Sequence, residues 1–339
     1  MTNEKELNVG IMGTGFMGAL YGRIYHQMDG VNVVAVLDID SQRVNPIAAE
    51  LGAEAYVGED YAGMIDEHPE LDAVIITTPE DAHVAPSMAA IQAEKHIFLD
   101  KPLATSTQDA IVILDALRDK DLISMMGYSL RFEPRYAAVK NAVENGNVGE
   151  IIHFVARRNM PLAVLERLEA RVEGPFWVGV HDIDMMRWVS GSNVRRVMAM
   201  VTQKGLEGWD FQGTYFALLE FENGVVAILE NAWTPSNLAG RAEPYIFKVE
   251  GTKGQIQVRG YDPGVTVYTE ESVLEPDTIW MPTSYGKLTG AYRDQMAYFV
   301  ECIREGKQTD IPLEEGLNGV KAAEAIIQSA ENGKEVVIS

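Results

Sequence analysis

A glycine-rich segment directly behind an apolar run is the strongest constraint on the fold. Gly13-Thr14-Gly15-Phe16-Met17-Gly18 follows the predicted strand Leu7–Met12 and opens a helical pattern. In such a G-x-G-x-x-G segment, the first glycine permits a tight turn and the second lets a pyrophosphate approach the backbone. The third lets the helix pack closely on the strand, while the helix N-terminus supplies N–H donors. The segment predicts a dinucleotide-binding Rossmann domain, and Phe16 and Met17 are expected to join the glycines at the cofactor.

A carboxylate follows at the position where such domains bind a ribose. Asp38 ends the predicted strand Val31–Leu37, twenty residues beyond Gly18. It can accept hydrogen bonds from the ribose hydroxyls of NAD and would repel the 2′-phosphate of NADP. Arg43, on the next turn, could instead reach a phosphate. NAD is therefore the predicted cofactor, and NADP is the less favoured alternative.

The first 126 residues alternate short apolar runs with amphipathic stretches. The runs that predict strands are Leu7–Met12, Val31–Leu37, Ala73–Thr77, His96–Leu99 and Leu122–Met126. The stretches long enough to be crossover helices include Met17–Met28, Pro86–Ala93 and Thr107–Lys120. This alternation is typical of βαβ units, so we expect an α/β fold with a doubly wound parallel sheet over residues 1–126.

From residue 127 to residue 339 the pattern changes to strands joined by turn signals such as Glu222-Asn223-Gly224. Predicted strands are Ile151–Arg157, Val194–Gln203, Gly213–Phe221, Val225–Trp233, Tyr245–Glu250, Gly254–Arg259 and the short Glu335–Ile338. Predicted helices are Pro134–Asn145, Tyr292–Glu305 and Leu313–Asn332. We expect a second, α+β domain in which consecutive strands run antiparallel.

The charge balance argues against two classes of partner. Asp and Glu outnumber Lys and Arg by 50 to 28, a formal net charge of -22. Such a field repels phosphate backbones and anionic lipid, so neither nucleic acid nor membrane is an expected partner. Cys302 is the single cysteine, which fits a reducing compartment, and no apolar run approaches the roughly 18 residues of a membrane span. We expect a cytoplasmic protein.

Two further motifs follow the predicted strand ends, Thr78-Pro79 with His83 and Asp100-Lys101-Pro102. Together with the glycine segment they resemble the Gfo/Idh/MocA family, named after glucose-fructose oxidoreductase and inositol dehydrogenase. The similarity continues through segments spread over most of the chain: Gly127-Tyr128-Ser129-Leu130-Arg131-Phe132, Gly146-x-Val148-Gly149-Glu150 and Gly179-Val180-His181-x-x-Asp184.

The resemblance implies a C-terminal domain with a large, mostly antiparallel open sheet, and an active site in the cleft between the domains. It implies hydride transfer between the nicotinamide and a secondary alcohol or ketone of a sugar, inositol or related cyclic polyol. Thr78, Pro79 and His83 would line the cofactor groove, and Lys101 would lie beside the nicotinamide. Asp100 stands where the family has glutamate, a change that keeps the carboxylate.

Lys101 and His181 are the candidate catalytic residues. Lys101 would exchange a proton with the reacting oxygen; the alternative is a solvent-facing lysine at a strand end. His181 suits proton transfer near neutral pH, although a lone histidine at a helix start is often structural. The family often has aspartate four residues before this histidine, whereas this chain has Trp177. A non-catalytic sensor of NAD or sugar is therefore the alternative function. His181-Asp182-x-Asp184 lacks a supporting cluster, so no metal is expected.

Several residues are candidates for contact with substrate, each with a structural alternative. Tyr128 and Arg131 would line the junction of cofactor and substrate, or serve in packing and a salt bridge. Arg157, on the opposite strand face from Arg158, would suit an anionic substrate or balance nearby acids. Trp177 would form a flat wall for a sugar ring. Trp233, followed by Thr234, Pro235, Ser236 and Asn237, would do the same or belong to the core.

Self-association is also expected. A large sheet with helices gathered on one side leaves its other face in need of a partner. Apolar residues alternate in Tyr215–Leu219 and Val225–Leu229, as they would on such a face. We expect a homodimer or a homotetramer.

Overall fold

The computed structural model describes residues 6–168, 171–206, 213–234, 245–260 and 264–338. They form two compact units. One comprises Met1–Ser129 and Ile279–Leu317, and the other Leu130–Thr278 and Asn318–Ser339. The sequence suggests a single boundary near residue 126, whereas the contacts group residues 279–317 with the first unit.

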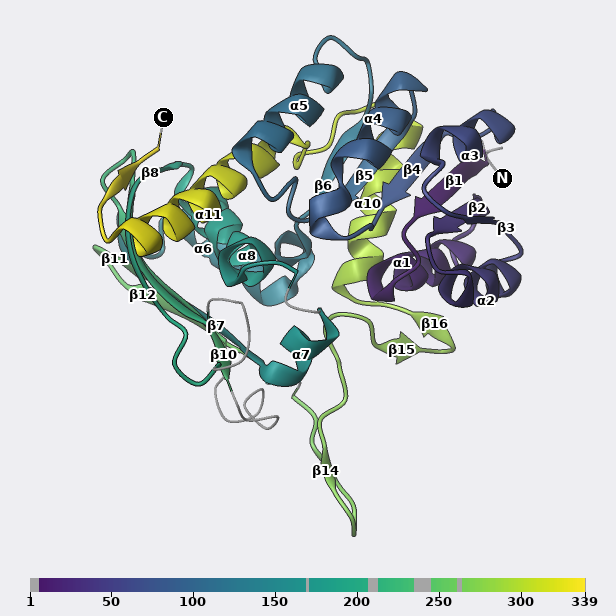
Figure 1. Ribbon diagram of the computed structural model, residues 1–339. Helices are drawn as coiled ribbons and strands as arrows, with labels where there is room; N and C mark the ends of the chain where they lie inside the picture. The colour runs from purple at the N-terminus through teal and green to yellow at the C-terminus, as the bar shows by residue number, and fades with distance from the viewer. Residues whose placement is uncertain (1–5, 169–170, 207–212, 235–244, 261–263, 339) are drawn as a thin grey trace. The chain divides into compact units, whose positions relative to one another are not determined.

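A six-stranded parallel sheet forms the centre of the first unit (Figure 1). Its order is β3-β2-β1-β4-β5-β6, so the predicted doubly wound sheet is confirmed. The strands are β1 (Leu7–Met12), β2 (Val31–Asp38), β3 (Glu54–Val57), β4 (Ala73–Ile76), β5 (His96–Asp100) and β6 (Ser124–Gly127). Strand β3 was not predicted, because this edge strand is mostly exposed and carries no apolar run.

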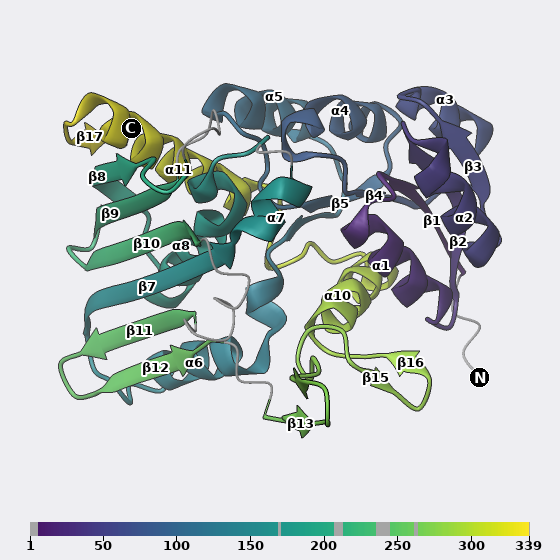
Figure 2. The ribbon, with the colours of Figure 1, turned by 60° about the horizontal axis from the view of Figure 1, so that its bottom comes forward.

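Helices cover both faces of this sheet (Figure 2). One layer contains α1 (Phe16–His26), α2 (Ser41–Leu51) and α10 (Ala291–Glu305), and the other contains α3 (Tyr61–Glu67), α4 (Val84–Gln92) and α5 (Thr107–Leu117). Side-chain caps at Asp40, Asp60 and Ser106 accept backbone N–H groups and fix three of the helix starts. Aromatic contacts hold α10 in its layer, since Tyr292 meets Tyr21 and Phe299 meets Phe98.

The second unit is built on a seven-stranded sheet in the order β12-β11-β7-β10-β9-β8-β17. The strands are β7 (Ile151–Pro161), β8 (Val194–Thr202), β9 (Thr214–Phe221), β10 (Val226–Thr234), β11 (Ile246–Gly251), β12 (Gln255–Arg259) and β17 (Val336–Val337). Only the pair β7–β10 is parallel among the paired strands that are described, so the expected mostly antiparallel sheet is confirmed. The parallel pair is possible because the long segment between the two strands contains helices as well as β8 and β9.

Helices α6 (Pro134–Glu144), α8 (Val180–Ser190) and most of α11 (Glu314–Asn332) lie on one side of this sheet (Figure 1). A π-helical turn, Pro175–Gly179, leads directly into α8. Ser329 anchors α11, because its hydroxyl accepts the Ala199 N–H of β8 at 2.8 Å. On β9, Tyr215 and Leu219 are buried toward the helices, while Phe216 and Leu218 are exposed.

The remaining elements are short and were not predicted. They include α7 (Leu162–Arg167) and the hairpins β13 (Val267–Tyr268) with β14 (Val273–Leu274), and β15 (Thr283–Ser284) with β16 (Lys287–Leu288). Within the described ranges, none of the helices combines the length and apolar character needed to cross a membrane.

Candidate active site

The glycine segment lies where the chain passes from β1 into α1. A Cβ at Gly13 would lie 2.6 Å from the carbonyl of Thr77, and one at Gly18 would overlap the Gly13 carbonyl oxygen. A Cβ at Gly15 would meet no atom within 4 Å. Gly13 and Gly18 thus allow close backbone packing. Gly15 leaves open space at the N-terminus of α1, which fits the diphosphate of a dinucleotide. Two more candidates, the exposed Phe16 and the half-buried Met17, lie on the first turn.

Asp38 ties this loop to the end of β2. Its Oδ2 accepts hydrogen bonds from the Thr14 backbone N–H at 2.6 Å and the Thr14 hydroxyl at 3.1 Å. Its Oδ1 accepts the Asp40 N–H at 3.0 Å. Arg43 is mostly exposed and pairs with Asp40 at 3.4 Å. The end of β2 therefore presents two carboxylates, and Arg43 is held by one of them.

The loop behind β4 contains Thr78, Pro79 and His83. Pro79 is exposed and Thr78 is half-buried. His83 is 1% exposed, and its Nδ1 and Nε2 lie 2.8 Å and 3.1 Å from the carbonyl oxygens of Pro102 and Thr78. The imidazole therefore bridges the loops that follow β4 and β5.

The loop behind β5 places Lys101 at the same edge of the sheet. The half-buried Lys101 follows Asp100, whose Oδ1 accepts the Lys101 N–H at 2.9 Å. Burial raises the pKa of Asp100 to about 6, although the charge of Lys101 opposes that rise. A Cβ at Gly127 of β6 would lie 2.7 Å from Asp100 Oδ1, so a side chain there would displace the carboxylate. Carboxyl ends of parallel strands form the ligand crevice in such folds, and Lys101 lies at that edge with the glycine loop.

In the second unit, Trp177 and His181 occupy the π-helical turn and the first turn of α8. Both side chains are half-buried, whereas the residues between them are buried. Residues four apart lie on the same side of a helix. Trp177 stacks on Trp233 of β10, with ring centroids 5.4 Å apart and an interplanar angle of 24°. The structure thus brings together two of the predicted substrate residues, of which Trp233 is 5% exposed.

Asn231 is a neighbouring residue that sequence reasoning missed. It is 2% exposed, and its Oδ1 has no hydrogen-bond partner among the described residues. A Cβ at Gly179 would lie 2.6 Å from that oxygen, so the π-helical turn passes close to it. The available signal was its position two residues before Trp233, on the same face of β10.

Two arginines of the second unit pair with carboxylates of the protein, unlike the arginines of a site that binds an anionic ligand. Arg131 forms a buried bidentate ion pair with Asp184, at 2.6 Å and 3.0 Å. Arg158 does the same with Asp182, at 2.9 Å for both contacts. Asp184 of α8 is therefore anchored to Arg131. Since successive strand residues alternate in direction, Arg157 points to the sheet face opposite to that of Arg158 and α8.

These contacts favour the structural alternatives for two candidates. Tyr128 is 1% exposed and Arg131 is occupied by Asp184, so packing and ion pairing account for both. Pro235, Ser236 and Asn237, named with Trp233, lie outside the described residues. No cluster of three or more metal-ligating His, Cys, Asp or Glu occurs within the described ranges.

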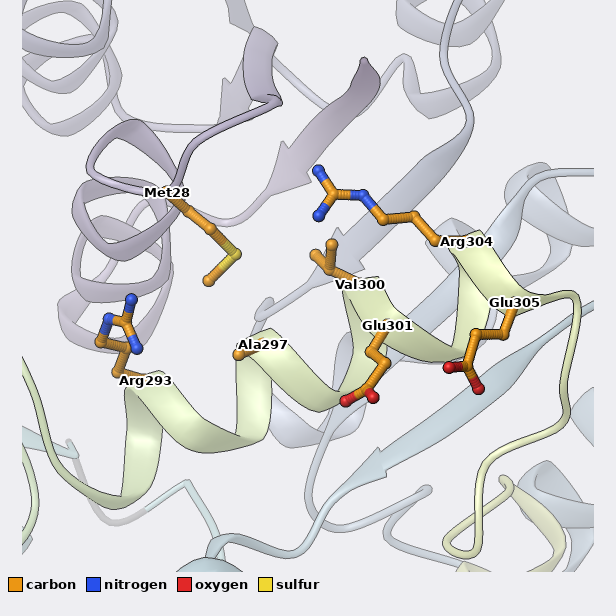
Figure 3. Close-up of a pocket in the computed structure, with 7 residues that line it drawn as sticks. All are labelled: Met28, Arg293, Ala297, Val300, Glu301, Arg304 and Glu305. Atoms are coloured by element: carbon orange, nitrogen blue, oxygen red, sulfur yellow. The ribbon is translucent and has the colours of Figure 1, made fainter. Parts of the chain in front are cut away.

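A surface groove of about 410 Å³ lies along α10 (Figure 3). It is lined by Met28, Ala297 and Val300 together with Arg293, Glu301, Arg304 and Glu305. Arg304 Nη2 donates to the carbonyl oxygens of Asp29 and Gly30, at 3.2 Å and 3.0 Å. None of the candidate site residues lines this groove, so it is separate from the candidate active site.

Comparison with known proteins covers both halves of the chain. Residues 7–128 match the family model described as oxidoreductase family, NAD-binding Rossmann fold (GFO_IDH_MocA), and residues 140–338 match that of its C-terminal alpha/beta domain. Inositol 2-dehydrogenase 2 of Saccharopolyspora erythraea is 30% identical over 96% of this chain and 94% of its own length. Levoglucosan dehydrogenase of Pseudarthrobacter phenanthrenivorans is 28% identical over 96% of each chain.

Solved structures agree with these matches. The myo-inositol 2-dehydrogenase of Lactobacillus plantarum superposes with a TM-score of 0.84 at 26% identity, over 99% of this chain and 100% of the other. The scyllo-inositol dehydrogenase of Lactobacillus casei, solved with NAD(H) and scyllo-inositol, has a TM-score of 0.82 at 23% identity, over 98% and 99% of the two chains, and supports the fold.

Proposed function

The chain belongs to the Gfo/Idh/MocA oxidoreductase family, and we propose that it uses NAD to oxidise or reduce a sugar, inositol or related cyclic polyol. The reaction is hydride transfer between the nicotinamide and a secondary alcohol or ketone. The observation that carries this function is the glycine loop at α1 combined with Lys101 at the same sheet edge. Both belong to one compact unit of a chain that matches the family over both halves.

The residues of the first unit suit the binding of NAD. Open space at Gly15 and the N-terminus of α1 would receive the diphosphate. Asp38 would accept a ribose hydroxyl, since an ionised carboxylate has about four acceptor sites and three hydrogen bonds reach it here. Asp38 and Asp40 together would repel the 2′-phosphate of NADP, so we propose NAD as the preferred cofactor.

The protein supplies acid–base chemistry and orientation, and the bound cofactor supplies the hydride acceptor. During oxidation the neutral amine form of Lys101 would take the proton of the substrate hydroxyl and become an ammonium; during reduction that ammonium would return the proton. We assign His181 the role of a hydrogen-bond donor or orienting group for the substrate. The exposed part of Trp177, backed by Trp233, would contact the C–H face of a sugar ring.

One experiment tests this function against its rivals. The purified protein is mixed with NAD and each member of a panel of cyclitols and sugars, and absorbance at the nicotinamide band is followed. Net NADH formation supports a dehydrogenase. Binding of NAD without turnover of any member of the panel would favour a non-catalytic sensor. Conversion of a substrate without net NADH would indicate that bound cofactor oxidises the substrate only transiently.

We also propose that the protein is a cytoplasmic homo-oligomer. The acidic charge and the single cysteine support the compartment. The sheet face opposite α6, α8 and α11 supports the oligomer, because Met198, Met200, Phe216, Leu218, Val226 and Ile228 are exposed there. Exposed apolar patches of this kind mark interaction sites, and a second copy of the chain offers the same surface.

A further inference from the structure

The ends of β1, β4 and β5 are connected by consecutive polar contacts. The Thr77 hydroxyl donates to the Gly13 carbonyl oxygen at 2.6 Å. The carbonyl of the next residue, Thr78, lies 3.1 Å from His83 Nε2, and His83 Nδ1 lies 2.8 Å from the Pro102 carbonyl oxygen. The glycine loop is therefore linked, through the loop behind β4, to the loop that carries Lys101.

His83 has no polar atom left for a ligand. Each nitrogen of His83 faces a backbone carbonyl oxygen, so neither has room for a second in-plane partner, and the neutral ring donates to one of these oxygens at a time. With 1% of its surface exposed, the ring also offers little apolar area to a cofactor. A contact between His83 and NAD would require the ring to leave both carbonyls.

The charge state of the ring matters for this bridge. Burial lowers the pKa of His83, whereas the buried Glu80 and the carbonyls opposite the ring counteract that effect. A neutral imidazole carries one N–H and donates to one carbonyl at a time. We assign that proton to Nδ1, because the distance to Pro102 is the shorter of the two.

We propose that His83 is a positioning residue, which holds the Lys101 loop at a fixed distance from the glycine loop without touching the cofactor. The inference rests on the proposed role of Lys101 in catalysis. The dinucleotide is held by the glycine loop, so the bridge fixes the lysine relative to the bound nicotinamide. A displacement of about 1 Å at a catalytic group can lower the rate on the order of 100-fold. Loss of the contact between His83 and the loop of Lys101 should therefore lower turnover.

Two variants of His83 separate positioning from contact. His83→Leu removes both polar contacts, whereas His83→Gln keeps an amide that can donate to one carbonyl. For His83→Leu we expect kcat to fall by about 10 to 100-fold with a smaller change in KM, and the Kd for NAD to change by less than about threefold. His83→Gln should recover part of the lost kcat. Calorimetry with NAD alone measures the Kd.

Hydrogen exchange supplies a measurement that needs no substrate. Peptides covering residues 98–106 should exchange faster in His83→Leu than in the unaltered protein, because the loop has lost a fixed contact. His96→Leu is the matched control: His96 begins β5 at its other end, where its Nδ1 accepts the Ile123 N–H at 3.1 Å. This control should leave both kcat and the exchange of residues 98–106 unchanged.

Two outcomes overturn the proposal. Unchanged exchange of residues 98–106 in His83→Leu would show that the ring does not hold the loop. A loss of NAD affinity that matches the loss of kcat would show that His83 contacts the cofactor. A panel in which no polyol reacts would count against the proposed function alone, since exchange and calorimetry still decide whether His83 positions the loop.

Discussion

Lys101 is the residue on which the proposed chemistry depends most. Replacement by methionine keeps an unbranched side chain of similar length and removes the amino group, so Lys101→Met should abolish measurable turnover. Because the proposed role of the lysine is at the reacting oxygen and not at the diphosphate, the Kd for NAD should stay within about threefold. Steady-state rates and calorimetry check the two halves of this expectation. Substantial turnover by the variant would assign the proton transfer to another residue.

The roles proposed for Trp177 and His181 at the substrate differ. His181→Ala should cost less than the lysine change, roughly 10 to 1,000-fold in kcat/KM, or about 1.4 to 4 kcal/mol. Trp177→Ala should mainly raise KM, because the indole offers a surface to the ring and no proton. Steady-state kinetics of both variants on the best substrate of the panel provide the comparison. A loss in His181→Ala as large as that in Lys101→Met would make the histidine the proton carrier.

Asp100 gives the stability of the protein a pH dependence opposite to that of most carboxylates. The ordinary pKa of an aspartate is 3.8, and burial in the folded protein raises that of Asp100 to about 6, because burial disfavours the charged form. The folded state therefore holds a proton that the unfolded chain releases between these values. The stabilising contribution is full below about pH 4 and is lost as pH rises through about 6.

Asp100→Asn should remove that dependence and keep an acceptor for the Lys101 N–H. The free energy of unfolding, measured in urea from about pH 4.5 to 7.5, should show the variant gaining on the unaltered protein as pH rises. Parallel curves for the two proteins would mean that the carboxylate ionises in the folded state as it does in the unfolded chain.

At the scale of single elements, substitutions in the loop between β1 and α1 distinguish an effect on folding from an effect on NAD binding. Gly18→Ala would push the helix away from the Gly13 carbonyl, so it should lower the melting temperature as well as NAD affinity. Gly15→Ala meets no atom within 4 Å and should leave the melting temperature nearly unchanged while it weakens NAD binding. Thermal unfolding and calorimetry on both variants test the pair. Normal NAD affinity in Gly15→Ala would place the diphosphate elsewhere.

Elements with a strong local pattern could be predicted from the sequence, and those without one could not. The apolar run Leu7–Met12 became β1 with the same bounds, and Gly13, Gly15 and Gly18 could be assigned from spacing alone. The edge strand β3 and the π-helical turn at Trp177 have no such pattern. Contacts formed by folding, such as the bridge at His83 and the ion pair of Arg131 with Asp184, depend on residues far apart in sequence and leave no local signal.

At the scale of the whole molecule, the chain crosses three times between its two units. Residues 279–317 return to the first unit, where α10 packs beside α1. The change of sequence pattern near residue 126 could not show that residues 279–317 belong to the first unit. The amphipathic pattern of α10 would be the same whichever unit the helix packs against. The turn signals alone predicted only that consecutive strands of the second unit run antiparallel. The family resemblance added the prediction that these strands form one large, mostly antiparallel open sheet.

The oligomer prediction also belongs to this scale, since it concerns an apolar surface that the described residues leave exposed. Antiparallel sheets that face water usually carry polar side chains, yet Phe216 and Leu218 on β9 are 50% and 58% exposed. Phe216→Glu with Leu218→Glu would place like charges on a shared surface and should shift the protein toward monomer in light scattering at micromolar concentration. Val57→Glu is the control, because Val57 is equally exposed at 58% but lies on the edge strand β3 of the other unit. A monomeric unaltered protein, or equal dissociation by the control, would show that this face is not the subunit interface.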